Sequence, residues 1–128
     1  MAKTFFIFYV SDQERSTEFY RRVFAREPNL HVPGMTEFEL EGGGSLGLMP
    51  EKGIRNLLGE ALPDPASAAG VPRAELYLSV DDADEHHQRA LEAGAKELSP
   101  FVDRPWGDRA SYLLDPDGHV LALAKPID

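Results

Sequence analysis

Four histidines are the side chains best suited to hold a metal or to transfer a proton near neutral pH, and they stand at positions 31, 86, 87 and 119. His86 and His87 are neighbours on a predicted helix, so their side chains point about 100° apart and cannot both face one ion. We predict that these two pack on the helix or lie in solvent. His119 is predicted to serve the tight turn that it follows. His31 lies in a proline-flanked loop that allows either a pocket or solvent around it.

Nucleophile and phosphate-binding motifs are missing from the sequence. The chain has no cysteine, which excludes a thiol nucleophile, a thiolate metal site and a disulfide framework. It contains no G-x-S-x-G, H-E-x-x-H or P-loop motif. The acidic run Asp115-Pro116-Asp117-Gly118 is explained by hairpin geometry alone, since proline presets φ and glycine supplies a positive φ. The sequence therefore shows no nucleophile–base pair.

Length and charge restrict the class of protein. The 128 residues suit one domain, with 42% hydrophobic and 27% charged residues. A formal net charge of -9 would repel a nucleic-acid backbone, and it favours either simple solubility or the attraction of cationic ligands. No stretch reaches the ~20 apolar residues that cross a membrane, and the start MAKTFFIFYVSD does not match a signal peptide. We therefore expect a cytoplasmic protein without nucleic-acid or membrane partners.

The first half of the sequence predicts a strand, a helix and a hairpin. Residues 5–10 are aromatic and β-branched, as in a strand covered on both faces. Asp12 can cap the next helix, which we expect to end at Pro28. Residues 36–41 alternate as a half-exposed strand, and a triple-glycine turn leads to its partner over 45–49. The helix has one apolar stripe, made of Phe19, Tyr20, Val23 and Phe24.

A long connection separates this half from a second one with the same order of elements. Residues 50–72 are rich in glycine and proline and predict a linker with one helical turn. A strand over 74–80 and a capped helix over 81–94 follow. The only tryptophan, Trp106, lies in the loop before the last two strands. The remaining strands are predicted at 96–101, 110–114 and 119–124.

The two halves correspond residue by residue. Asp12 corresponds to Asp82 at an offset of 70, and Gly44 corresponds to Gly118 at an offset of 74. Such a repeat predicts a pseudo-two-fold pair of curved sheets with a cleft between them. We assign residues 1–128 to a single domain, with module one at about 1–52, a linker at about 53–72 and module two at about 73–128.

Three segments carry a resemblance to a known family. They are VSDQERSTEFYRRVF at 10–24, ELYLSVDDADEHHQRALEAGA at 75–95 and RPWGDRASYLLDPDGHVLALAKP at 104–126. Together they resemble the glyoxalase/bleomycin resistance/dioxygenase family, also called vicinal oxygen chelate proteins. The resemblance implies an α+β fold in which two tandem βαβββ modules form curved sheets around a cleft. It also implies a homodimer, and in small members both subunits often complete the cavity.

The chemistry of that family implies four inward-facing positions, on the first and last strand of each module. In the metalloenzymes they hold His, Glu or Gln around a divalent ion. A catalytic ion needs about three protein ligands, and only Glu75 of this set could bind one. We therefore predict no metal and no cofactor, as in the bleomycin resistance proteins, which bind a bulky cationic drug without chemistry. Counted from the helix caps and turn glycines, the four positions are Phe5, Leu48, Glu75 and Ala122.

The first functional hypothesis is bleomycin-resistance-like binding or sequestration of a small aromatic or cationic molecule in a dimer cleft, without a metal. The resemblance places Trp106 at the cavity mouth, and a buried anchor is the alternative role. Two enzyme hypotheses stay open. One is a lactoylglutathione lyase or dioxygenase-like metalloenzyme that uses Glu75 with His31 or His119, and the other is a metal-free enzyme with Glu75 as general base. The predicted ligand-binding residues combine aromatic faces with one carboxylate: Phe5, Tyr9, Leu48, Glu75, Tyr77, Trp106, Tyr112 and Ala122.

Overall fold

The first module is a four-stranded mixed sheet with one helix packed on it. A computed structural model describes residues 2–128 of the chain. The sheet, called sheet A, has the strand order β1-β4-β3-β2, with β1 and β4 parallel and the other pairs antiparallel. Strand β2 is not predicted from the sequence, because it has only three residues and all are exposed. The elements are β1 (Phe5–Val10), α1 (Gln13–Phe24), β2 (Leu30–Val32), β3 (Met35–Glu39) and β4 (Ser45–Pro50).

Helix α1 is fixed at both ends by local interactions. The Asp12 carboxylate accepts a hydrogen bond from the Arg15 amide at 3.0 Å, which confirms the predicted cap. The helix ends at Phe24, because Ala25 adopts a left-handed conformation with φ 54°. The expected end at Pro28 is therefore wrong: the backbone leaves the helix before the proline is reached.

The second module repeats the same order of elements. Its sheet, called sheet B, has the strand order β5-β8-β7-β6, with β5 and β8 parallel. Irregularities interrupt the pairing of β6 with β7. Together the modules confirm the expected α+β fold of two tandem βαβββ units. The elements are β5 (Glu75–Ser79), α3 (Ala83–Glu92), β6 (Lys96–Asp103), β7 (Asp108–Leu114) and β8 (Val120–Pro126).

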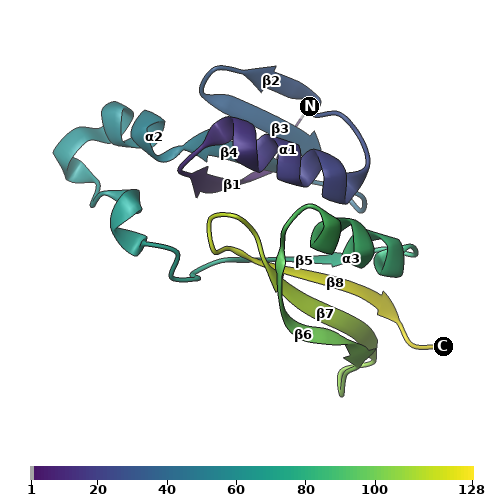
Figure 1. Cartoon of the computed structure of the whole chain (residues 1–128). Coiled ribbons are helices and arrows are strands. Elements are labelled where there is room, and N and C mark those ends of the chain that lie inside the picture. Colours follow the sequence, from purple (N-terminus) through teal and green to yellow (C-terminus); the bar gives the residue numbers. More distant parts are fainter. Residues whose placement is uncertain (1) are drawn as a thin grey trace.

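The connection between the modules is more ordered than its glycine and proline content indicates. It holds helix α2 (Glu51–Leu58) and two 3-10 helices, η1 (Gly59–Ala61) and η2 (Pro65–Ala68). The Asp64 carboxylate caps η2 by accepting a hydrogen bond from the Ala66 amide. Ile54, Leu57 and Leu58 have the i, i+3, i+4 spacing of a helix, so the single helical turn expected from the glycine and proline content is too short. In Figure 1 this teal connection runs along one side of the molecule from sheet A to sheet B.

The modules differ by one residue at the start of their last strand. In sheet A, Ser45 directly follows the turn glycine and pairs with Phe5. In sheet B, His119 stands between the turn glycine and β8, so that Val120 pairs with Glu75. The last strands are therefore related by an offset of 75, and the expected offset of 74 is wrong for them.

This inserted residue decides which way Leu48 points. Side chains alternate between the faces of a sheet, so a shift of one residue moves a side chain to the opposite face. Leu48 pairs with Phe8, is fully buried and belongs to the hydrophobic core. Ala122 instead alternates with the core residues Leu121 and Leu123 and lies on the other face of its sheet. The prediction that Leu48 shares a face with Phe5 is therefore corrected.

One hydrophobic core joins both modules. Helices α1 and α3 pack against each other, and the inner sides of both sheets pack on them. In Figure 1, module one with α1 occupies the upper part of the view and module two with α3 the lower part. The outer side of each sheet faces away from α1 and α3, and we call these sides the open faces. The core includes Phe8, Val10, Phe19, Tyr20, Val23, Phe38, Leu46, Leu48, Leu78, Val80, Leu113, Leu121 and Leu123.

Candidate functional site

The open face of sheet B carries a series of hydrogen-bonded aromatic side chains. The Trp106 indole N–H donates to the Tyr77 hydroxyl at 2.9 Å, and that hydroxyl donates to the Asp108 carboxylate at 2.5 Å. The Trp106 side chain is 54% exposed, so this hydrogen bond rather than burial holds it in place. Trp106 is therefore not a buried anchor.

Arg104 and Tyr112 form the neighbouring part of this face. The Arg104 guanidinium lies 5.2 Å from the centre of the Tyr112 ring and donates to the Ala110 carbonyl. Ala122, fully buried, pairs with Tyr77 on one side and with Tyr112 on the other. A small side chain thus forms the floor between the two aromatic rings, on the face predicted for it.

Glu75 and Asp108 are acidic groups of the same face. Glu75 is exposed at the start of β5, two residues before Tyr77. Burial and the hydrogen bond to Asp108 raise the pKa of Tyr77, so its hydroxyl stays protonated at neutral pH. A carboxylate becomes a better general base when it is shielded from water. In the single chain Glu75 lacks that shielding.

The open face of sheet A is largely apolar. Phe5, Ile7 and Tyr9 alternate onto it from β1, and Gly47 of β4 pairs with Ile7. A Cβ atom on Gly47 would meet the Ile7 Cγ1 atom at 3.0 Å, so Ile7 can lie over this position because it is a glycine. Phe5 and Tyr9 therefore share a face as predicted, in a different sheet from Tyr77 and Tyr112.

The open faces do not offer the ligand set of a catalytic metal. By the observed pairing, the strands that would supply ligands present Phe5, Gly47, Glu75 and Ala122 there. A catalytic divalent ion takes about three protein ligands and keeps one position open. This set holds a single carboxylate, so it does not fit such an ion, and we assign it no metal-dependent step.

Two histidines considered as further ligands lie elsewhere. The Nε2 atom of His31 is 2.9 Å from the Glu14 carboxylate on α1. The Nε2 atom of His119 is 3.0 Å from the Tyr9 carbonyl oxygen. Within residues 2–128, neither histidine joins Glu75 in a group of three ligand atoms close enough to hold one ion.

One cluster of potential ligands lies where the first module's turn meets α3. The ligand atoms of Glu41, Asp82 and His86 lie within 4.8 Å of one another, the only such group of three in the part of the chain that the structure describes. The Arg89 guanidinium lies 3.1 Å from His86 Nδ1 and 3.8 Å from the Asp82 carboxylate. The positive charge of Arg89 already compensates carboxylate charge in this cluster, so we assign no metal to it.

Ser111, His87 and Glu97 are arranged like a nucleophile, a base and an orienting acid. The Ser111 Oγ atom lies 2.8 Å from His87 Nδ1, and His87 Nε2 lies 3.1 Å from the Glu97 carboxylate. Ser111 is fully buried beneath α3, so a substrate cannot reach its oxygen. The three residues connect α3 to sheet B, and the sequence alone could not bring them together.

Two residues of the sheet B open face were missed from the sequence. Asp108 shares the face of Tyr112 through the two-residue period of β7, but the predicted strand begins only at residue 110. If the two-residue alternation had been continued from residue 110 back to residue 108, Asp108 would have been found. Arg104 reaches the face from the loop of Trp106, and no periodicity marks a loop residue.

Comparison with known proteins identifies the family. A family model described as Glyoxalase/Bleomycin resistance protein/Dioxygenase superfamily matches residues 4–123. The chain belongs to this superfamily. An uncharacterized protein of Mycobacterium bovis, Mb0911c, is 31% identical over 122 residues, which cover 92% of this chain and 79% of that protein. An uncharacterized protein of Mycobacterium tuberculosis, Rv0887c, is also 31% identical, over 92% of this chain and 71% of that protein.

Solved structures share the superfamily fold with this chain. A glyoxalase-related enzyme from Fulvimarina pelagi matches with a TM-score of 0.78 and 23% identity, over 97% of this chain and 87% of that one. A glyoxalase/bleomycin resistance protein/dioxygenase from Nocardioides matches with a TM-score of 0.77 and 23% identity, over 100% and 85% of the two chains. At these identities the likeness concerns the fold alone.

Proposed function

We propose that this superfamily member binds a small aromatic or cationic molecule without a metal, in a cleft that the open face of sheet B forms with the open face of sheet A from a second copy. The Trp106 ring carries the proposal, because it is 54% exposed and yet fixed by its hydrogen bond to Tyr77. A fixed aromatic surface can stack on a planar ligand with little further loss of side-chain freedom.

The charges of this face favour a cation over an anion. Glu75 and Asp108 lie on the face of Tyr77 and Tyr112, and the whole chain carries a net charge of -9. The Arg104 cation is held between an aromatic ring and a backbone carbonyl. The carboxylates therefore remain to attract a positively charged ligand.

Partly exposed apolar side chains support the predicted homodimer. The two open faces point away from the shared core, so the side chains on them need another surface to be buried. On the open face of sheet A, Ile7 is 43% exposed and Val32 is 44% exposed. Apolar sheet faces of this kind favour contact with a partner surface.

Fluorescence of Trp106 tests ligand binding directly, because it is the only tryptophan. We expect saturable quenching on titration with bleomycin and with a planar cation such as ethidium. A planar sulfonated anion of similar size is the control and should quench much less.

Two variants test the residues of the site. Tyr77→Phe removes the hydroxyl that accepts the hydrogen bond of the Trp106 indole and should weaken binding by roughly fivefold. Glu75→Gln should weaken binding of the cations but not of a neutral aromatic compound.

Two outcomes would overturn the proposed function. One is that none of these compounds changes the fluorescence. The other is that the planar anion binds as tightly as the cations. Stoichiometric zinc, nickel, manganese or iron in the purified protein would count for the metalloenzyme hypothesis instead.

The assembly is tested by sedimentation analysis. Val32→Glu places a charge on the open face of sheet A and should shift the protein to a monomer. Leu57→Glu is the matched control, since Leu57 is 71% exposed on α2 rather than on a strand of sheet A, and should leave the assembly unchanged. If the parent protein is a monomer, the proposed cleft between two copies is wrong.

The cellular location stays a prediction. Within residues 2–128, no helix has the length and apolar character needed to cross a membrane. The expected cytoplasmic location and the expected lack of nucleic-acid partners are compatible with the acidic charge and are open to fractionation experiments.

A further inference from the structure

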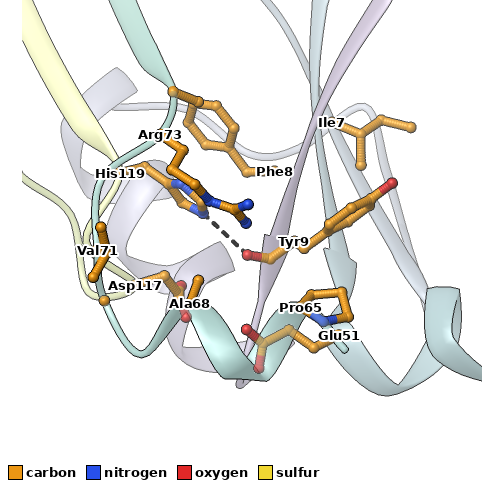
Figure 2. A pocket seen from close by; sticks show the side chains of 12 residues that line it. Ile7, Phe8, Tyr9, Glu51, Pro65, Ala68, Val71, Arg73, Asp117 and His119 are labelled. Carbon is orange, nitrogen blue, oxygen red and sulfur yellow. Dashed lines mark hydrogen bonds between the residues drawn. The ribbon is translucent and has the colours of Figure 1, made fainter. Parts of the chain in front are cut away.

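A separate cavity of about 300 Å³ lies under the connection between the modules. Its walls come from β1, from the start of α2, from the connection and from the turn before β8 (Figure 2). None of the aromatic residues of the sheet B open face lines it. Ile7 and Tyr9 of the sheet A open face contribute to its wall, but the cavity is formed within a single chain and needs neither Trp106 nor a second copy. Its size is at the lower end of the range for small-molecule sites.

Two opposite charges face this cavity without a partner. The Arg73 guanidinium and the Glu51 carboxylate make no side-chain hydrogen bond or ion pair with any other residue in the range 2–128. Figure 2 shows them on opposite sides of the Tyr9 carbonyl group. Burial, followed by the charges of Asp117 and Asp64, raises the pKa of Glu51. A cationic group beside Glu51 would therefore stabilise its ionised carboxylate.

The other acidic group of the cavity is already saturated. The Asp117 carboxylate accepts hydrogen bonds from the amide and hydroxyl of Ser11 and from the Ser16 hydroxyl. It also lies 3.4 Å from the Arg15 guanidinium. Asp117 thus fixes the turn of module two and leaves Glu51 as the available carboxylate.

His119 forms a rigid wall beside Arg73. Its ring stacks on Phe8 with the ring centres 4.3 Å apart, and its Nε2 atom lies 3.0 Å from the Tyr9 carbonyl oxygen. Figure 2 shows this contact and the Arg73 side chain next to it. Pro65, Ala68 and Val71 add an apolar lining. The cavity therefore combines two separated charges, which lie on either side of the Tyr9 carbonyl group, with apolar side chains on part of its wall.

We propose that this cavity binds a small zwitterion, with the ligand carboxylate at Arg73, the ligand ammonium at Glu51 and the intervening carbon chain against the apolar lining. A simple anion would leave Glu51 unmatched, and a simple cation would leave Arg73 unmatched. A ligand that covers either charge without pairing with it removes water from that charge and binds more weakly. Arg73 suits a carboxylate because its guanidinium can donate two parallel hydrogen bonds.

Calorimetric titration with ω-amino acids, from glycine to 6-aminohexanoate, tests the proposal. We expect one chain length to bind best and to bind at least roughly tenfold more tightly than the carboxylate or the amine of the same length. Arg73→Gln should abolish this advantage over the amine, and Glu51→Gln should abolish the advantage over the carboxylate. Lys52→Gln is the control, because it removes an exposed charge of α2 outside the cavity lining and should leave binding unchanged. Thermal melting confirms that each variant is folded.

Amide chemical shifts locate the bound ligand. The shifts should change at Tyr9, Arg73 and His119, while the Trp106 indole signal stays in place. A shifted indole signal would instead put the ligand on the open face and overturn this inference without affecting the proposed function. The inference also fails if no zwitterion binds up to roughly 10 mM, or if both charge variants bind as the parent does.

Discussion

The hairpin turns of the two modules each lie against the helix of the other module, but they do so with different chemistry. In module two, Asp115 accepts a hydrogen bond of 2.5 Å from Tyr20 of α1, and both side chains are buried. In module one, the corresponding turn places the exposed Glu41 near Asp82, which precedes α3, and near the buried His86 of α3. The two modules share the path of the chain, but the polar contacts of their turns differ.

The connection between the modules adds to this difference. A chain of two modules has one connection, so it can cover only one of the two turns. Here Gly70 of the connection lies so close to Gly118 that a Cβ atom on Gly118 would meet the Gly70 carbonyl oxygen at 2.3 Å. The turn of module two is therefore enclosed from both sides, and that of module one is not. Substitutions in the two turns can test how unequal they are.

The largest effect is expected for Gly118→Ala. Gly118 has φ +87° and no room for a Cβ atom against the Gly70 backbone, so we expect the free energy of unfolding to fall by about 3 kcal/mol or more. Gly44→Ala is the matched control in module one. Gly44 has φ +76°, but the nearest atom to its Cβ position is 3.8 Å away, so only the backbone cost of about 1 kcal/mol applies. If urea unfolding shows that Gly118→Ala and Gly44→Ala lower the free energy of unfolding equally, the expected difference between the two turns is wrong.

The next effect concerns the buried pair of Tyr20 and Asp115. Tyr20→Phe leaves one carboxylate oxygen of Asp115 without its hydroxyl donor, and we expect a loss of about 2 kcal/mol in the free energy of unfolding. Asp115→Asn should cost less, because its amide oxygen can still accept from the amides of Asp117 and His119 while its NH2 group donates to Tyr20. Chemical denaturation of both variants checks the order, and a costlier Asp115→Asn would contradict it.

The same pair should make stability depend on pH. Burial is the main cause that raises the pKa of Asp115 above its ordinary value. The folded state therefore keeps this proton to higher pH than the unfolded state, whose pKa is about 3.9. The stability contributed by Asp115 is full below that value and is lost as the pH rises through the folded-state pKa. Relative to Asp115→Asn, the parent protein should lose stability from about pH 4 toward neutrality. A flat or rising difference would contradict this.

The smallest effect is expected in the turn of module one. Glu41 is exposed and lies near a second carboxylate, Asp82, so the main effect of Glu41→Gln is to remove a weak, solvent-screened repulsion. The free energy of unfolding should change by no more than about 0.5 kcal/mol. A loss as large as that of Tyr20→Phe, measured in the same way, would show that the two turns are equally important.

The sequence predicted the fold because both modules follow strong local patterns. Alternation in the strands and the cap at Asp12 located most elements, and the repeat related the two modules. Helix α2 was largely missed, because the glycines and prolines around it outweighed the helical spacing of Ile54, Leu57 and Leu58. Strand β2 was missed because three exposed residues carry no pattern.

The candidate site was predictable only where alternation sets the face. Phe5 and Tyr9 lie on one open face, and Tyr77 and Tyr112 on the other, as the two-residue period indicates. Leu48 was assigned to the wrong face, because the extra residue in the turn of module two cannot be seen by matching glycines. The hydrogen bonds of Trp106 and Ser111 join distant segments, and no spacing in the sequence reveals such contacts.

The bond between Tyr20 and Asp115 spans 95 positions of the chain, and this distance bears on how the protein folds. The Tyr20 hydroxyl and the Asp115 carboxylate are satisfied only when the two modules have come together. The chain must therefore lose the entropy of closing a long loop before this hydrogen bond can stabilise either module. We expect the duplicated halves to lose their structure together, in one cooperative transition. On this expectation the two similar modules form one folding unit, and neither would keep its structure when cut from the other.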